Sequence, residues 1–407
     1  MKPFLNWFAR VGGTFYVATS LIITFKIATL RRLMRVNSAF DADKIVDNFS
    51  HMDDMFYHAA VAPKSQRPCA LRADPAPLPD AFTFRGQTLT LDDWRASRAV
   101  TAMIVLRDGK IAFEDYYLDT AREDQRISWS MAKSFLSATF GIAVGEGLLG
   151  SLDDLVTEHV PHLKDSAYNG VTVRHVLNMS SGVAFNEDYL DYHSDINRMG
   201  RVLALGHSMD GFACSLKKRA YDPGSRLKYV SIDTHVIGMV LRKITGQSAR
   251  AYMGQKLLKP MGLEYDSYFL TDGDGVDFVL GGLNLATRDY ARFGLLMACD
   301  GKYNGQQIVP SDWVRQSTVD TAPPPAEDMA PTDEGLLRYG YQWWLPPDAE
   351  QGEFFAIGIY GQYIYVNRPR KTVIAVNAAN RDFKVGLGAV TLANLALYRE
   401  IAHQDGR

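Results

Sequence analysis

The sequence predicts an α/β (α+β) protein whose sheet is formed by both ends of the chain, with a mostly helical unit inserted between them. Two β-rich runs occupy residues 100–117, and β-rich segments return only from residue 354 onwards. Between them, the apolar residues recur mainly at the three- and four-residue spacing of amphipathic helices. Because strands from both ends of a chain can pair in one sheet, this order predicts one sheet-containing unit and one helical insertion.

The first β-rich segment has the pattern of a hairpin. Residues 100–117 are rich in β-branched and aromatic side chains, and the Asp108–Gly109 pair at their centre is a strong signal for a two-residue turn. Near the other end of the chain, residues 354–366 and 372–377 have the same β-rich character. Residues 389–402 then predict a final helix that is apolar on one face.

Four helices are predicted between these β-rich segments. The first covers residues 130–150, and the second begins at residue 171 and ends at Ser180-Ser181-Gly182. The other two cover residues 232–243, which are followed by Thr245-Gly246, and residues 287–297. A glycine just past the last periodic residue is a common helix end, because glycine adopts the left-handed conformation needed there.

The composition excludes several classes of function. With 47% hydrophobic residues the chain can bury a large core, and its net charge of −2 gives no electrostatic basis for binding nucleic acid. The cysteines Cys69, Cys214 and Cys299 are far apart and do not have the spacing of a metal or redox site. We therefore expect no nucleic-acid partner, no metal and no cofactor.

An apolar segment lies near the N-terminus, at residues 11–30, and contains Lys26 and a few hydroxyl side chains. The uninterrupted apolar run to Phe25 is shorter than the ~20 residues that a membrane-spanning helix needs, although the Lys26 side chain could extend to the membrane surface near one end. No convincing signal-peptide cleavage site follows the segment. Residues 1–35 are thus predicted to be a membrane anchor or a signal-like segment, which makes the protein membrane-associated. Arginines after the run favour a cytoplasmic body, but basic residues also precede it, so the side of the membrane stays open.

The rest of the chain divides where the composition changes. Residues 36–84 include a proline-rich link and are predicted to form an extension, or arm, that wraps around the body. Residues 85–407 are predicted to form the catalytic unit. Its α/β part covers residues 85–128 and 270–407, and its helical part covers residues 129–269.

Ser130 and Lys133 form the pattern on which the predicted function depends. Residues three apart on a helix are neighbours, so the lysine nitrogen can reach the serine oxygen. In the first turn of a helix the N–H of Ser130 also has no partner within the helix, which makes it a candidate donor to a substrate oxyanion. If the apolar helix is buried, Lys133 is buried with it, and burial lowers the pKa of a lysine toward the range where it can accept a proton.

The spacing by itself is weak evidence. Ser215 and Lys218 are also three residues apart, and a helix cap beside a solvated lysine is the alternative interpretation of Ser130 and Lys133. The surroundings separate the two pairs, because Ser130 precedes a long apolar helix whereas Ser215 leads into a run of basic residues.

Two other kinds of site have less support in the sequence. The chain has no Gly-x-Ser-x-Gly motif, and His175 and His235 lie within helical patterns, where packed or surface histidines are expected rather than members of a Ser-His-Asp triad. His51 and His58, with nearby aspartates, could imitate a metal cluster. They lie in the arm, where we expect a solvated helix face.

Four stretches of the chain occur in a recognisable order. Ser130-Met-Ala-Lys133 is followed by residues 171–182, with the form Val-Thr-Val-Arg-His-Val-Leu ending in Ser-Ser-Gly. Residues 222–231 begin with Asp-Pro-Gly and end with Tyr229-Val-Ser231, and residues 281–294 contain a further helix signature. In this order they resemble the serine β-lactamase and penicillin-binding-protein superfamily, over roughly residues 85–400, and especially its class C and esterase-like branch. A second Tyr-x-Asn, Tyr365-Val-Asn367, lacks the Pro-Gly approach.

The resemblance implies a β-lactamase/transpeptidase-like fold, with an antiparallel sheet flanked by helices, and hydrolysis through an acyl-enzyme. Ser130 is then the nucleophile, and Lys133 and Tyr229 form the base system. Which of the two is the base is disputed within such enzymes, so the role is given to the pair.

One departure from the family pattern bears on the substrate. The third family motif has Lys or His, then Thr or Ser, then Gly, whereas this chain has Ala356-Ile-Gly358-Ile-Tyr-Gly-Gln362. The missing cation argues against a penicillin or D-Ala-D-Ala substrate, and the segment resembles the 6-aminohexanoate-dimer hydrolases and their esterase relatives. The resemblance implies that the backbone N–H of Ile359 is the second oxyanion donor. It also places Tyr189, Ser231, Gly358 and Tyr360 among the substrate-binding residues.

The resulting prediction is a serine carboxylesterase or amidase that acts on a small-molecule ester or linear amide. A β-lactamase or D-Ala-D-Ala peptidase-like enzyme is one alternative, and a non-catalytic, membrane-tethered binding protein is another. The joint presence of Ser130, Lys133 and Tyr229 counts against the last, because a decayed site should have lost at least one of them.

Overall fold

The computed structural model describes residues 29–66, 68, 70–329, 337–383 and 389–404. Residues 29–37 are helical. Within the described ranges, every helix is too short or too polar to cross a bilayer. The predicted anchor, residues 1–35, lies mostly outside the described residues and stays a prediction.

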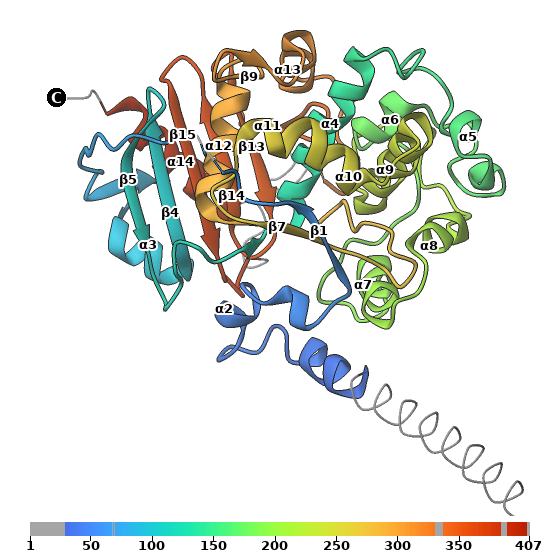
Figure 1. Cartoon of the computed structure of the whole chain (residues 1–407), viewed down its shortest axis with the longest axis horizontal. Coiled ribbons are helices and arrows are strands. Elements are labelled where there is room, and N and C mark those ends of the chain that lie inside the picture. The colour runs from blue at the N-terminus through green and yellow to red at the C-terminus, as the bar shows by residue number, and fades with distance from the viewer. Residues whose placement is uncertain (1–28, 67, 69, 330–336, 384–388, 405–407) are drawn as a thin grey trace, which may run out of the picture.

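A seven-stranded antiparallel sheet forms one side of the molecule (Figure 1). Its strands in spatial order are β11 (Arg338–Tyr339), β12 (Trp344–Leu345), β13 (Glu353–Gly358), β14 (Gln362–Asn367), β15 (Thr372–Ala378), β4 (Val100–Arg107) and β5 (Lys110–Tyr116). Strand β4, from the first third of the chain, pairs with β15, from the last. The predicted α/β class and the union of both chain ends in one antiparallel sheet are therefore confirmed.

Two hairpins of this sheet have turns formed by residues with positive φ angles. Strands β4 and β5 turn at Asp108 and Gly109, whose φ angles of 49° and 76° are those a two-residue hairpin turn requires. The β-rich run 354–366 is not one strand but the hairpin β13–β14, whose turn contains Tyr360 and Gly361 with φ angles of 62° and 90°. The residues that connect these two strands thus lie outside the pairing of the sheet.

Helices cover both faces of the sheet. Helix α12 (Thr287–Ala298) packs against β4, β14 and β15. Helix α14 (Ala389–His403) packs on the opposite face, where Tyr398 contacts the rings of Tyr363 and Tyr365. Alternate strand residues therefore face the two helices, as the two-residue repeat of a strand requires.

The mostly helical part of the chain lies beside the sheet (Figure 1). Its α-helices are α4 (Ala132–Gly145), α5 (Val156–His159), α6 (Val173–Leu177), α7 (Asp195–Leu205), α8 (Met209–Ser215), α9 (Ser231–Thr245), α10 (Ala249–Met253) and α11 (Lys259–Met261). Helix α4 is buried along residues 132–143, on all its faces, and packs against α9, α10 and α13 (Ser311–Ser317). A helix that is apolar all round is expected at the centre of a domain. The division at residues 129–269 and 85–128 with 270–407 stays a prediction.

The first predicted helix is shorter than residues 130–150. Ser130 lies in a 3₁₀ turn, η2 (Trp129–Met131), and α4 begins after it. The helix ends at Gly145, because Gly147 adopts a φ of 76° and the N–H of Leu148 returns to the carbonyl of Ala143 at 3.1 Å. This is the hydrogen-bond pattern of a glycine-terminated helix.

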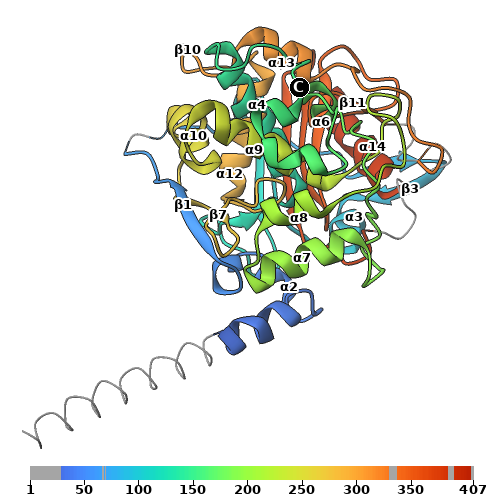
Figure 2. The same cartoon turned by 90° about the vertical axis from the view of Figure 1, so that its right-hand side faces the viewer.

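The arm contributes to the fold and does more than wrap around it. Its strand β1 (His58–Ala62) joins a second sheet with β7 (Ser267–Leu270), β8 (Leu283–Leu285) and β6 (Arg126–Ile127). Strand β6 leads directly into η2. The arm helix α2 (Ile45–Asn48) lies at one end of the body in both views (Figure 2).

Short elements complete the described structure. They are the hairpin β2 (Ala81–Phe84) with β3 (Gln87–Thr90), α3 (Leu91–Ser97), the pair β9 (Lys302–Tyr303) and β10 (Gln306–Gln307), the 3₁₀ helices η1 (Met52–Asp54) and η3 (Pro161–Asp165), and the π-helical turn η4 (Gly254–Leu258).

The contact of α12 with the sheet gives a test of the fold. A Cβ on Gly294 would lie 2.5 Å from Val373 Cγ1 and 2.9 Å from Ile364 Cγ2, so Gly294→Ala should lower the free energy of unfolding by about 1–3 kcal/mol. Gly200, inside α7, has open space around it, and Gly200→Ala should raise that free energy by about 0.5–1 kcal/mol. Denaturant unfolding of both variants measures the difference, and a stabilising Gly294→Ala would contradict the described packing.

Candidate active site

The turn before α4 brings a serine hydroxyl and a lysine amine together. The half-buried Ser130 lies in η2, and Lys133 lies in the first turn of α4 with 2% of its surface exposed. Lys133 Nζ donates to Ser130 Oγ at 2.9 Å and to the carbonyl oxygen of Leu280, also at 2.9 Å. The amine is therefore held between the hydroxyl and a backbone oxygen of a loop about 150 residues away.

Burial controls the proton affinity of this lysine. Removal from water lowers the pKa of Lys133 to about 7, and the negative charge of Glu187 partly opposes that shift. Near neutral pH a large share of the Lys133 side chains is then unprotonated, which allows the nitrogen to accept a proton from Ser130. This is the range in which a general base is most effective.

Tyr229 lies next to the lysine, just before α9. Its ring centroid is 5.3 Å from Lys133 Nζ, and its ring stacks on Trp344 at a centroid distance of 5.5 Å. The Pro-Gly approach turns the chain at Gly224, whose φ is 78° and whose N–H donates to the carbonyl of Ser180 at 2.7 Å. The structure thus brings Ser130, Lys133 and Tyr229 together.

The end of β13 meets the nucleophile turn. Gly358 is packed so closely that a Cβ on it would lie 2.4 Å from the carbonyl oxygen of Ser128, which explains why a glycine is required. Ile359 follows immediately and lines the same cavity as Ser130. Backbone segments more than 200 residues apart in the sequence therefore meet beside the Ser130 hydroxyl.

A cavity of about 550 Å³ opens over Ser130. Tyr189, Tyr229, Gly358 and Ile359 line it, together with the mainly apolar group Met329, Leu337, Trp344, Ile357, Phe383 and Val390. Lys133 is buried behind Ser130, to which its amine is hydrogen-bonded, and is not itself one of the described lining residues. Ser231 is also buried, and its backbone N–H donates a hydrogen bond to the carboxylate of the lining residue Glu187.

Tyr360 lies at the edge of the site. Among the described residues, Ile359 lines the cavity and the neighbouring Tyr360 does not. The Tyr360 ring packs against Phe40, Phe49 and Trp129, with centroid distances between 5.2 and 5.9 Å, and against the lining residue Phe383, with a centroid distance of 4.5 Å. Tyr360 thus lies directly behind a lining residue, and its predicted contact with the substrate stays a prediction.

Glu187 is the residue that the sequence analysis missed. It lines the cavity, accepts the N–H of Ser231 and influences the proton affinity of Lys133. It also adds to the effect of burial, which raises the pKa of Tyr189 well above its usual value. The sequence does show an acidic residue two positions before Tyr189. It does not show that this residue lies near Lys133, because the fold brings the two segments together.

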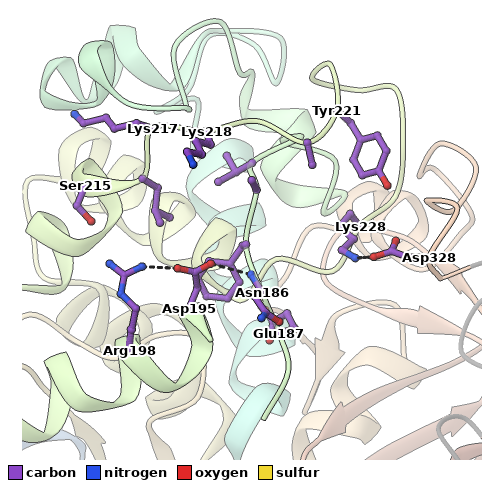
Figure 3. Close-up of a pocket in the computed structure, with 15 residues that line it drawn as sticks. Asn186, Glu187, Asp195, Arg198, Ser215, Lys217, Lys218, Tyr221, Lys228 and Asp328 are labelled. Carbon is purple, nitrogen blue, oxygen red and sulfur yellow. Dashed lines mark hydrogen bonds and ion pairs between the residues drawn. The ribbon is translucent and has the colours of Figure 1, made fainter. Parts of the chain in front are cut away.

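A second cavity, of about 770 Å³ (Figure 3), adjoins the first. The two share Asn186, Glu187, Lys228 and Asp328 as lining residues. Lys228 and Asp328 form an ion pair, and the N–H of Asn186 donates to Asp195 at 3.0 Å (Figure 3). The wall between the cavities therefore consists of one loop segment and one ion pair.

The alternative candidates have structural surroundings of their own. Ser215 Oγ donates to the carbonyl of Phe212 at 2.6 Å at the end of α8, where it lines the second cavity and not the cavity over Ser130. The buried Tyr365 donates to Glu353 at 2.7 Å inside the sheet. His235 Nε2 lies 2.7 Å from Asp210 Oδ1, and His175 caps α6. Among the residues that the structure describes, no group of His, Cys, Asp and Glu has the arrangement of a metal site.

The comparison with protein families decides the relationship. A family model described as Beta-lactamase matches residues 87–398. The chain belongs to the beta-lactamase family. It is a serine hydrolase of that family, which confirms the resemblance to β-lactamases and penicillin-binding proteins predicted from the ordered motifs.

Individual relatives extend this finding. The 6-aminohexanoate-dimer hydrolase of Paenarthrobacter ureafaciens is 28% identical over 341 residues, which are 80% of this chain and 83% of the relative. A solved structure from Bacillus anthracis, named as a candidate 6-aminohexanoate-dimer hydrolase, has a TM-score of 0.76 and 23% identity over 90% of this chain and 95% of its own. EstCE1, described as a hydrolase with promiscuous acyltransferase activity, has a TM-score of 0.58 and 15% identity over 76% and 95%. The two structures establish the likeness of the fold.

The buried lysine predicts a pH-dependent stability. The pKa of Lys133 is lowered in the folded state, so the unfolded chain binds the extra proton between about pH 7 and 10.5, and wild-type stability should rise with pH across that window. Lys133→Met removes the cost of burying the amine. It should therefore raise Tm most at pH 6 to 7, and the gain should shrink toward pH 10.

Thermal unfolding at several pH values measures this effect, with Lys218→Met, at an exposed position, as the matched control. A Lys133→Met gain that is constant with pH, or equal to that of the control, would contradict a desolvated lysine.

Proposed function

We propose that this serine hydrolase cleaves an ester or a linear amide through an acyl-enzyme on Ser130. The observation that carries the proposal is the 2.9 Å contact between Lys133 Nζ and Ser130 Oγ, made by a buried lysine whose pKa is lowered to about 7. A serine hydroxyl is a weak nucleophile until a neighbouring base takes its proton. Here that base lies beneath the floor of a cavity large enough for a small-molecule substrate.

The proposed reaction has two halves. Ser130 Oγ attacks the carbonyl carbon while its proton passes to the Lys133–Tyr229 pair, and the backbone N–H groups of Ser130 and Ile359 stabilise the oxyanion. One such donor typically contributes about 3–4 kcal/mol to transition-state stabilisation. The pair returns the proton to the leaving amine or alcohol as the C–N or C–O bond breaks. A water molecule then hydrolyses the acyl-Ser130 ester by the same steps in reverse order.

The lining of the cavity favours a neutral or cationic substrate end. Glu187, Asp188 and Asp328 are the acidic lining residues, and Lys228, paired with Asp328, is the basic one among the described residues. The strand beside the site has Ala356 and Ile357 where a substrate carboxylate would require a cation and a hydroxyl. A free carboxylate close to the scissile bond would therefore lie in an unfavourable field.

Linear amides are the substrate class with most support. The 28% identical relative is named for hydrolysis of the 6-aminohexanoate dimer, and the half-buried Tyr189 lies in the cavity beside Phe383, where it can contact a leaving amine. Esters are the second class, because the same serine chemistry cleaves them. β-Lactam or D-Ala-D-Ala hydrolysis, or binding without catalysis, remains a distinguishable outcome of the following test.

Reaction with a fluorophosphonate tests the nucleophile. The Ser130 oxygen should displace fluoride from phosphorus, and peptide mapping should place one adduct on Ser130. Ser130→Ala should remove the adduct and lower p-nitrophenyl ester hydrolysis by more than about 10³-fold, because the covalent step is lost.

Ser215→Ala is the matched control and should keep both the adduct and the activity. An adduct on another serine, or full activity in a folded Ser130→Ala variant, would refute the proposal. Faster turnover of a cephalosporin than of any linear amide would instead favour the β-lactamase alternative.

A further inference from the structure

Four aromatic rings form a cluster beside the proposed active site. Phe40 and Phe49 come from the arm, Trp129 from the nucleophile turn and Tyr360 from the β13–β14 turn. We call them the aromatic clamp. All six ring pairs are in contact, with centroid distances from 5.2 Å for Phe40 on Tyr360 to 6.3 Å for Phe40 and Phe49.

Two rings of the clamp belong to residues with a strained backbone. Trp129 has a φ of 44° and Tyr360 has a φ of 62°, in the left-handed region that bulky residues rarely adopt. Trp129 directly precedes Ser130, and Tyr360 directly follows Ile359. The two backbone N–H groups proposed to stabilise the oxyanion are thus each next to a residue whose conformation needs support from its surroundings.

The arm is tied to the same segment by hydrogen bonds. The N–H of Ile127 donates to the carbonyl of Phe49 at 3.1 Å. The Arg126 guanidinium, 1% exposed, donates to the carbonyl of Val46 and to Ser50 Oγ, both at 2.7 Å. These contacts fix the arm against β6, which is the strand that leads into the nucleophile turn.

On one side, the junction is held by close packing around Gly358. Gly358 lies against the carbonyl of Ser128, so the end of β13 and the nucleophile turn cannot move closer. On the outer side, the stacked rings of Phe40 and Tyr360 have interplanar angles of only 9° and prevent the turn after β13 from moving away. The separation of the two proposed donors is therefore limited from both sides.

We propose that the arm is a working part of the catalytic site, in which Phe40 and Phe49 are positioning residues that hold Trp129 and Tyr360 and so fix the distance between the N–H groups of Ser130 and Ile359. This inference rests on the proposed acyl-enzyme at Ser130. It also gives Tyr360 a role that does not require contact with the substrate.

The exposure of the rings makes Phe40 the residue to change. Phe49 is 1% exposed, so its removal would damage the core, whereas Phe40 is 39% exposed. In the full chain, Phe40→Ala should lower kcat for a p-nitrophenyl ester about 10- to 100-fold, because a small displacement of an oxyanion donor weakens transition-state binding. KM should change less than about threefold, and the rate of phosphonylation of Ser130 should fall in parallel with kcat.

Tyr57→Ala is the matched control. Tyr57 is an aromatic residue of the same arm, is 38% exposed and contacts Arg32 instead of the clamp. It should lower Tm as Phe40→Ala does but leave kcat within about twofold of wild type. Phe40→Tyr keeps the stacked ring and should restore kcat, a rescue that general loss of stability would not produce.

The outcomes separate this inference from the proposed function. Wild-type protein without a phosphonyl adduct on Ser130 would refute the acyl-enzyme, whereas an adduct formed equally fast in wild type and folded Phe40→Ala would refute the clamp alone. If Phe40→Ala does not fold, Phe40→Leu keeps apolar cover without a flat ring. A folded Phe40→Leu protein with lowered kcat supports the clamp, and one with wild-type kcat overturns it.

Discussion

The contact between Lys133 and Ser130 is the constraint on which the rest of the site depends. A lysine amine becomes a useful base near neutral pH only when it is removed from water, and α4 achieves this by being buried along residues 132–143. The carbonyl of Leu280 satisfies the amine without adding a charge that would keep it protonated. Glu187 is the nearby acidic group that acts in the opposite direction. The apolar core of the helical part thus also lowers the pKa of Lys133.

The second constraint is that distant segments must meet at one serine. The nucleophile turn follows β6 and Ile359 follows β13, and these two strands belong to different sheets. Their junction depends on the absence of a side chain at Gly358 on the inside and on aromatic packing outside. The arm, which also adds β1 to the smaller sheet, is in this view part of the enzyme core and not only a connection to the N-terminal segment.

Local signals explain what the sequence could predict. The Asp108–Gly109 hairpin, the apolar residues of α4 and the Pro-Gly approach to Tyr229 depend on neighbours in the chain, and the structure contains all three. The role of Glu187 and the place of Tyr360 could not be predicted, because each depends on contacts between residues that are 44 or more positions apart in the sequence. The helix boundary at Ser130 was missed for another reason, since an apolar pattern does not distinguish a 3₁₀ turn from the first turn of an α-helix.

The most direct test of the account is the pKa of Lys133 in the folded protein. Lysine labelled with ¹³C at the ε-carbon reports the protonation of each amine by NMR, and Lys133→Met assigns the signal. We expect one lysine that titrates near pH 7, and a still lower pKa of Lys133 in Glu187→Gln, because that variant removes the negative charge that raises the pKa. A protein in which the Lys133 signal titrates above about pH 10, like an ordinary lysine, would contradict the claim that burial makes Lys133 the base for Ser130.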